Sequence, residues 1–212
     1  MTTMAADSPR TSREQDEPRS ELVGGSRVFA WLLIICGAIG VGASAMITHD
    51  KMLLLKDPDA TLACSLNPIF SCGTIMQSWQ ASLFGFPNPY IGWVAYSMLV
   101  IIGVGLLAGG RFARWWWIGL WAGTLFGAAF VTFLQYTSLY EVQKLCLWCM
   151  IAWVVTIALF WYTTVHNIKT GVFRVSEGVR TNVTEFHWVV PVLWYVAIFL
   201  AMYVKWGSNL WA

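Results

Sequence analysis

Long stretches without a charged residue constrain this chain more than any other feature of its sequence. Five runs contain no Asp, Glu, Lys or Arg: 28–48, 90–108, 115–140, 145–165 and 188–204. A helix needs about 20 predominantly apolar residues to cross a bilayer. Helices satisfy their own backbone in lipid, and the runs lack the alternation of hydrophobicity that is typical of barrel strands. The sequence therefore predicts an all-α integral membrane protein.

The composition agrees with this prediction and excludes some functions. Only 11% of the residues are charged and 58% are hydrophobic, whereas soluble chains carry roughly 25% charged residues. The three aromatic residues Trp115, Trp116 and Trp117 are typical of a membrane–water boundary. A net charge of +2 indicates no nucleic-acid partner. The low charge content and the apolar runs make the lipid bilayer the expected surrounding.

The basic residues predict an orientation in the membrane. If the N-terminus is cytoplasmic and the spans alternate, all 13 Lys and Arg lie on the cytoplasmic side except Lys51, Lys56, Lys144 and Lys205. This distribution follows the positive-inside rule. It places Cys64, Cys72, Cys146 and Cys149 on the outer side, where disulfides form and persist.

The runs divide the chain into four parts. We expect a disordered cytoplasmic tail over 1–27 and a four-helix catalytic domain over 28–165. A cytoplasmic connection over 166–187 and a fifth transmembrane helix over 188–206 should follow. The outer loop over 49–89 contains an apolar stretch, 73–84, that is too short to span and suits a helical lid over the bundle.

Cys146 and Cys149 stand at the start of the fourth run. If the run is a helix, their spacing puts both thiols on one face, close enough for a disulfide. Unpaired N–H groups, the helix dipole and nearby Lys144 all favour thiolate over thiol, which indicates a reactive pair. The alternatives are a structural disulfide or half of a metal site.

Cys64 and Cys72 form a second pair on the same side. Asn67-Pro68 between them indicates a turn, so we expect this pair on a movable loop. A movable pair and a fixed pair suit thiol–disulfide exchange, and a lipid-soluble quinone that takes two electrons would meet the fixed pair. A metal-binding or transport protein that uses all four thiolates, or a scaffold with two structural disulfides, are the alternative functions.

Several other residues carry weaker signals. Cys36 is expected to be a small packing residue, and Gly119, Gly123 and Gly127 recur on one face in a pattern that predicts close helix packing. Polar residues near the outer end of the third run either line a pocket or bond to a neighbouring helix; they are Gln135, Tyr136 and Ser138. The candidates for protonating a quinone, without ranking, are His49, Asp50 and Glu141.

These motifs together resemble the vitamin K epoxide reductase family in its bacterial form. The resemblance covers about Val28 to Val165 and rests on four motifs: Cys64-x7-Cys72, Ser78-Trp79, Phe86-Pro87-Asn88-Pro89 with Gly92, and Cys146-x-x-Cys149. It implies a four-helix bundle around a quinone, capped by the outer loop, in the bacterial inner membrane. It also implies that Cys149 reacts with the quinone, that Cys72 exchanges with Cys146, and that Cys64 receives electrons from a partner.

The resemblance further implies the quinone contacts Ser78, Trp79, Asn88 and Trp153. Asn88 would donate a hydrogen bond to a quinone oxygen, with capping of the second span as its alternative role. Trp153 stands where animal members have a Tyr, so menaquinone or ubiquinone is preferred over vitamin K epoxide. The chain ends at Ala212 without the thioredoxin-like domain that many bacterial relatives carry. We therefore expect a separate, secreted or membrane-tethered thioredoxin-like partner of the DsbA type.

Overall fold

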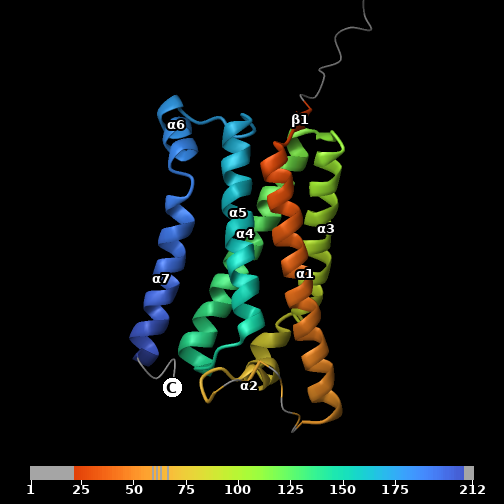
Figure 1. Cartoon of the computed structure of the whole chain (residues 1–212), viewed down its shortest axis with the longest axis vertical. Helices are drawn as coiled ribbons and strands as arrows, with labels where there is room; N and C mark the ends of the chain where they lie inside the picture. Colours follow the sequence, from red (N-terminus) through yellow and green to blue (C-terminus); the bar gives the residue numbers. More distant parts are fainter. Residues whose placement is uncertain (1–21, 59, 61, 63, 66, 208–212) are drawn as a thin grey trace, which may run out of the picture.

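The fold is a bundle of long helices, as the uncharged runs predict (Figure 1). A computed structural model describes residues 22–58, 60, 62, 64, 65 and 67–207. In this part of the chain five helices are long and apolar enough to cross a membrane. They are α1 (Arg27–Lys56), α3 (Pro89–Leu107), α4 (Arg114–Tyr136) with its π-helical continuation η3 (Thr137–Val142), α5 (Leu147–Lys169) and α7 (Val189–Trp206). The predicted all-α membrane architecture is thus confirmed.

The helices are arranged around α1 and α5. Helix α1 packs against both α3 and α5, α4 packs against α5, and α7 lies at the edge of the bundle against α5. Close packing of α1 on α3 depends on glycines: a Cβ on Gly40 would lie 2.5 Å from the ring of Tyr96, and one on Gly103 would lie 2.8 Å from the carbonyl oxygen of Ala30. Glycine at these positions lets the two backbones approach each other.

The first membrane helix is longer than the predicted span 28–48. It continues without a break to Lys56, and the N–H of Asp57 closes it on the carbonyl of Leu53. No Gly or Pro follows Thr48 until Pro58, so nothing in the sequence stops the helix earlier. His49, Asp50 and Lys51 therefore lie on the last turns of α1 rather than on a loop.

The predicted lid helix over 73–84 is divided in two. Helix α2 (Cys72–Gln77) and the 3-10 helix η2 (Trp79–Ser82) are separated by Ser78, whose backbone is extended. Both lie at the end of the bundle where α5 begins (Figure 1). Asn88 connects this lid to α3, because its side chain donates to the carbonyl of Gln80 and accepts from the N–H of Leu83.

The opposite end of the bundle carries β1 (Val23–Gly24), β2 (Arg111–Phe112) and the short helix α6 (Glu177–Glu185) (Figure 1). Val23 pairs with Phe112 in the antiparallel register, and Trp117 donates from its indole nitrogen to the carbonyl of Val23. The prediction of disorder up to residue 27 is wrong for Val23 and Gly24, because the turn over 108–113 offers their backbones partners for strand pairing. Residues 1–21 lie outside the described part of the chain.

Candidate functional site

Cys146 and Cys149 share the first turn of α5. Cys146 is the residue before the helix, with extended backbone angles, and its Sγ accepts the backbone N–H of Cys149 at 3.4 Å. The sulfur thus takes the place of the Ser or Thr oxygen that usually caps a helix. Both thiols are reduced in this structure. Cys146 is fully buried, whereas Cys149 is partly exposed.

The surroundings of Cys146 favour its thiolate. A hydrogen bond with the Cys149 side chain lowers the pKa of the Cys146 thiol, and the backbone amides of Cys149 and Trp148 lower it further. Burial of the thiol and the negative charge of Asp50 act in the opposite direction, but the pKa is still below its ordinary value. A thiolate is the attacking species in thiol–disulfide exchange, so Cys146 is the more reactive sulfur of the pair.

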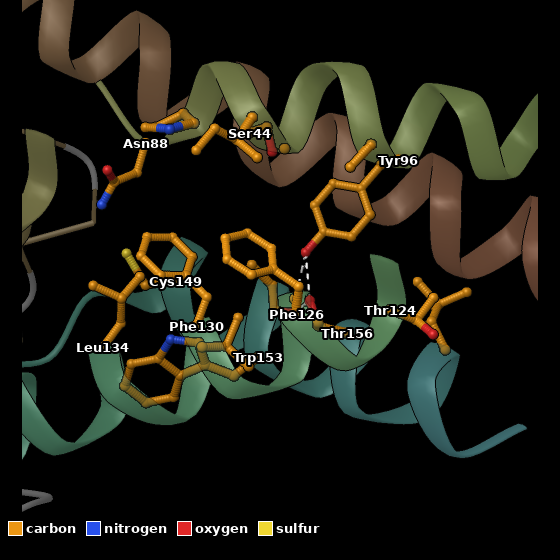
Figure 2. A pocket seen from close by; sticks show the side chains of 18 of the residues that line it. Ser44, Asn88, Tyr96, Thr124, Phe126, Phe130, Leu134, Cys149, Trp153 and Thr156 are labelled. Atoms are coloured by element: carbon orange, nitrogen blue, oxygen red, sulfur yellow. Dashed lines mark hydrogen bonds between the residues drawn. The ribbon is translucent and has the colours of Figure 1, made fainter. Parts of the chain in front are cut away.

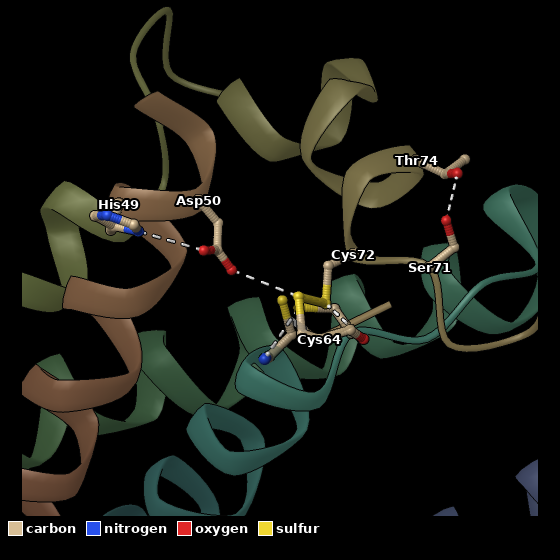
Figure 3. The surroundings of a disulfide bond; sticks show 8 residues. His49, Asp50, Cys64, Ser71, Cys72 and Thr74 are labelled. Atoms are coloured by element: carbon tan, nitrogen blue, oxygen red, sulfur yellow. Dashed lines mark hydrogen bonds and ion pairs between the residues drawn. A yellow bond between two sulfur atoms is a disulfide. The ribbon is translucent and has the colours of Figure 1, made fainter. Parts of the chain in front are cut away.

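Cys64 and Cys72 are joined in a disulfide with 5.9 Å between their Cα atoms (Figure 3). Cys72 is the first residue of α2, and the two cysteines are 1% and 0% exposed. Asn67 forms the predicted turn between them, since its Oδ1 accepts the backbone N–H groups of Ile69 and Phe70 at 2.9 and 2.8 Å. The disulfide is enclosed by the same buried cluster that contains Cys146.

Main-chain contacts hold the loop with this disulfide against the start of α5. Phe70 and Leu145 form an isolated parallel bridge, in which the N–H of Leu145 donates to Ile69 at 2.9 Å. Lys144 adds a hydrogen bond from Nζ to the carbonyl of Pro68 at 2.7 Å. The sequence predicted a movable loop; the structure shows that loop docked, with the two cysteine pairs in adjacent segments.

Asp50 is the buried carboxylate of this region. It is 5% exposed, its Oδ2 lies 3.5 Å from Sγ of Cys64, and its Oδ1 lies 3.5 Å from Nδ1 of His49 (Figure 3). Sequence reasoning named Asp50 only as a candidate proton donor to a quinone. The structure instead places it beside the disulfide, a position that no local pattern indicated because Cys64 is 14 residues away.

A cavity of about 440 Å³ extends along the inside of α3, α4 and α5 beneath the lid (Figure 2). Its lining runs from Cys149 and Asn88 near the cysteines to Trp115 and Trp116 at the far end of α4. Most of the lining is apolar, with a few polar side chains, as in binding sites for apolar small molecules. The polar residues in the lining are Ser44, Ser78, Gln80, Asn88, Tyr96, Thr124, Thr137, Ser138 and Thr156.

Three of the four predicted quinone contacts line this cavity. They are Ser78, Asn88 and Trp153, of which Trp153 is almost fully buried. Ser78 donates to the carbonyl of Ile75 at 2.7 Å. Asn88 precedes α3 but does not cap it; its amide holds the lid. Trp79 does not line the cavity and is 66% exposed, because the short 3-10 helix turns its side chain outward.

Other cavity residues were not recognised in the sequence or were misinterpreted. Tyr96 and Thr156 both lie in the cavity wall, where a 2.6 Å hydrogen bond connects their hydroxyls (Figure 2). The prediction that Gly119 and Gly123 mediate helix packing is wrong, since a Cβ on either would meet nothing within 4 Å and both face the cavity. Of the three glycines Gly119, Gly123 and Gly127, only Gly127 closely approaches another helix, at Thr156 of α5.

The structure also places the residues with weaker sequence signals, and it bears on the metal-binding alternative. Cys36 packs against the core around Phe29 and Leu33, as expected. Ser138 lines the cavity, whereas Gln135 and Tyr136 do not. Within the described residues no three His, Cys, Asp or Glu side chains are grouped as a metal site would require, and two of the four thiols are paired with each other. The arrangement does not favour the metal-binding alternative.

Comparison with known proteins agrees with this geometry. Residues 31–164 match the Vitamin K epoxide reductase family, a stretch that begins in α1, ends in α5 and includes both cysteine pairs and the lid. A search of curated proteins finds no match to the chain. The match covers more than half of the chain, so this protein belongs to the vitamin K epoxide reductase family of membrane thiol–disulfide oxidoreductases.

Proposed function

We propose that this protein oxidises the dithiol of a thioredoxin-like protein of the DsbA type and passes the electrons to a membrane quinone, menaquinone or ubiquinone. One observation carries the proposal. Cys149 lines the apolar cavity while it is hydrogen-bonded to Cys146, and Cys146 is buried in the same cluster as the Cys64–Cys72 disulfide. These contacts support a route for electrons from the Cys64–Cys72 pair through Cys146 and Cys149 to the cavity.

The electron transfer proceeds by two thiol–disulfide exchanges. A partner thiolate attacks Cys64, Cys72 leaves as a thiol, and the second partner thiol displaces Cys64 to complete the partner's disulfide. Cys72 then attacks Cys146 of an inner disulfide, Cys149 leaves, and Cys64 displaces Cys146, which restores the outer disulfide. Each exchange moves two electrons and two protons. The structure, with the outer pair oxidised and the inner pair reduced, corresponds to the state after the second exchange.

The cavity suits a quinone with an isoprenoid tail. When bound, a quinone supplies an acceptor for two electrons and two protons. Asn88, Ser78 and Trp153 would surround its ring beside Cys149, and the long apolar lining toward Trp116 would hold the tail. Cys149 would deliver the electrons, and the disulfide with Cys146 would re-form.

The partner requires access that the docked loop does not provide. Cys64 is 1% exposed, so the segment around it must open before a protein thiol can attack its sulfur. Hydrogen bonds to Pro68 and Ile69 help to hold the segment, and they would break and re-form in each cycle. A folded partner would therefore contact the surroundings of Cys64 and Pro68.

The proposed location is the bacterial inner membrane, with the N-terminus cytoplasmic and the cysteines outside. Arg111, Arg114, Lys169, Arg174 and Arg180 all belong to the end of the bundle opposite the cysteines, in support of this orientation. A membrane-impermeant maleimide added to intact, reductant-treated cells should label Cys64 and Cys72. If it labels them only after the membrane is permeabilised, the orientation is the reverse.

Replacement of Cys149 tests the function directly. Cys149→Ala should abolish reduction of ubiquinone-1 or menadione by dithiothreitol, whereas Cys36→Ala should retain the rate. A Cys149→Ala protein that reduces quinone at the wild-type rate would contradict the scheme. Cys64→Ala should still oxidise dithiothreitol, which can reach the inner pair, but should lose activity with a DsbA-type protein. A DsbA-type protein whose second active-site cysteine is replaced by Ala lacks the thiol that displaces Cys64, so it should accumulate as a mixed disulfide with Cys64 that mass spectrometry can detect.

A further inference from the structure

Gln80 is a buried polar side chain in the cavity lining with one unsatisfied atom. It belongs to η2, is 6% exposed and lines the cavity near Asn88. Its Nε2 donates to Oε2 of Glu141 at 2.7 Å, but its Oε1 is buried and has no hydrogen-bond partner among the described residues. A buried amide oxygen without a partner is costly, so its retention indicates that something else donates to it.

Glu141 determines which atom of the Gln80 side-chain amide, Nε2 or Oε1, remains without a partner. The carboxylate lies on η3, is exposed to solvent, and can only accept hydrogen bonds when ionised. The nitrogen of the Gln80 amide must therefore face Glu141, which leaves the oxygen without a partner among the described residues. The lid itself is anchored, because the main-chain carbonyl of Gln80 accepts a 2.7 Å hydrogen bond from Asn88. Gln80 is thus held at both its side chain and its backbone.

An acceptor in this position distinguishes the two redox forms of a quinone. Quinone oxygens only accept hydrogen bonds, whereas quinol hydroxyls also donate. We infer that Gln80 Oε1 accepts a hydrogen bond from a quinol hydroxyl and that Glu141 is the positioning residue that keeps this oxygen available. The inference rests on the proposed function and adds a specificity to it: the cavity binds the reduced ligand more tightly than the oxidised one.

Preferential binding of quinol has a consequence for the reaction. A ligand whose reduced form is bound more tightly is a stronger oxidant when bound than when free. For a two-electron couple, a tenfold preference corresponds to about 30 mV. The Gln80 contact would therefore favour transfer from Cys146 and Cys149 into the cavity.

Equilibrium binding tests the inference without turnover. All proteins carry Cys149→Ser, so that ligand and protein do not exchange electrons, and quenching of tryptophan fluorescence reports Kd for ubiquinone-1 and for ubiquinol-1 under anaerobic conditions. Gln80→Met should raise Kd for ubiquinol-1 about 3- to 10-fold, the usual effect of one hydrogen bond, and leave Kd for ubiquinone-1 nearly unchanged. Gln77→Met is the matched control, since Gln77 is exposed and outside the cavity lining.

Glu141→Gln provides a second variant that changes only an exposed side chain. An amide at this position can accept or donate, so the Gln80 amide is free to turn, and the preference for ubiquinol-1 should fall in the same direction. Glu185→Gln, at the other end of the bundle, should have no effect. Equal changes in both Kd values for Gln80→Met, or no change for either variant, would overturn the inference.

The proposed function is tested separately in the same preparation. If the Cys149→Ser protein binds neither ubiquinone-1 nor ubiquinol-1, both proposals are wrong. If it binds both with the expected preference, but the unmodified chain does not reduce ubiquinone-1 or menadione with dithiothreitol, the oxidoreductase scheme is wrong and the binding inference stands.

Discussion

Asp50 Oδ2 lies 3.5 Å from Sγ of Cys64, and the Asp50 side chain is 7% exposed. A carboxylate in this place puts negative charge beside the Cys64–Cys72 disulfide and close enough to Cys146 to act on that thiol. Its charge also opposes ionisation of Cys146 and so raises the pKa of that thiol, against the stronger effect of Cys149. The pKa of Cys146 therefore depends on two neighbouring side chains that act in opposite directions, in addition to burial and the backbone amides.

Asp50→Asn should lower the pKa of Cys146 further, because it removes the negative charge that disfavours the thiolate. In the fully reduced protein, the pH midpoint of Cys146 alkylation by iodoacetamide should move to lower pH. Mass spectrometry of the Cys146 peptide gives this midpoint, which does not depend on the slow absolute rate of a buried thiol. Glu177→Gln, at the opposite end of the bundle, is the control, and an unchanged midpoint in Asp50→Asn would contradict the prediction.

Cys149→Ala should have the opposite effect on the same thiol. The Cys149 side chain contributes most to the lowered pKa of Cys146, so its removal should raise the pKa and shift the alkylation midpoint to higher pH. At neutral pH the thiolate fraction falls, and the variant should be alkylated more slowly than the wild-type chain. A midpoint at or below that of the reduced wild-type protein would show that the backbone amides alone stabilise the thiolate.

The turn at Asn67 should control how easily the outer disulfide is reduced. Asn67→Ala leaves the N–H groups of Ile69 and Phe70 without their acceptor, at a cost of about 1–2 kcal/mol to the docked loop. Dithiothreitol should then reduce Cys64–Cys72 roughly 5- to 30-fold faster, as measured by the mass shift after alkylation. Asn67→Asp retains the acceptor and should reduce at nearly the wild-type rate.

A substitution at Gly40 should destabilise the bundle. A Cβ at this position would lie 2.5 Å from the Tyr96 ring, so Gly40→Ala must separate α1 from α3 or displace Tyr96 from the cavity wall. Overpacking of this kind costs about 1–3 kcal/mol and should lower the Tm in detergent. Gly42→Ala is the matched control on the same helix, because a Cβ at Gly42 meets nothing within 4 Å. Equal Tm values for the two variants would contradict the packing described here.

A substitution at Gly123 should block the cavity without this loss of stability. Gly123 lines the cavity and has open space where a Cβ would be, so the side chain in Gly123→Leu would occupy the ligand's volume. The Kd for ubiquinone-1 should rise at least about tenfold, equivalent to 1.4 kcal/mol, while the Tm is nearly unchanged. Gly42→Leu should bind as the wild type does; tight binding by Gly123→Leu would place the ligand elsewhere.

Much of this protein follows from local features of the sequence. Transfer of a charged residue into lipid is unfavourable wherever it occurs, so uncharged runs of sufficient length predict membrane helices without reference to the rest of the chain. The turn at Asn67 and the start of a helix beside Cys146 are equally local. The cysteine spacings and their family resemblance added the class of chemistry, which the match over residues 31–164 supports.

Tertiary structure decided which face of each element meets the cavity. Hydrophobicity is nearly uniform around these helices, so sequence alone could not orient Gly123 toward the cavity or Trp79 away from it. The contacts that complete the site join distant positions: Asp50 with Cys64, and Gln80 with Glu141, 61 residues apart. Such pairs depend on the orientation of each element about its axis in the packed bundle. Long-range contacts fix that orientation, so no local sequence pattern predicts it.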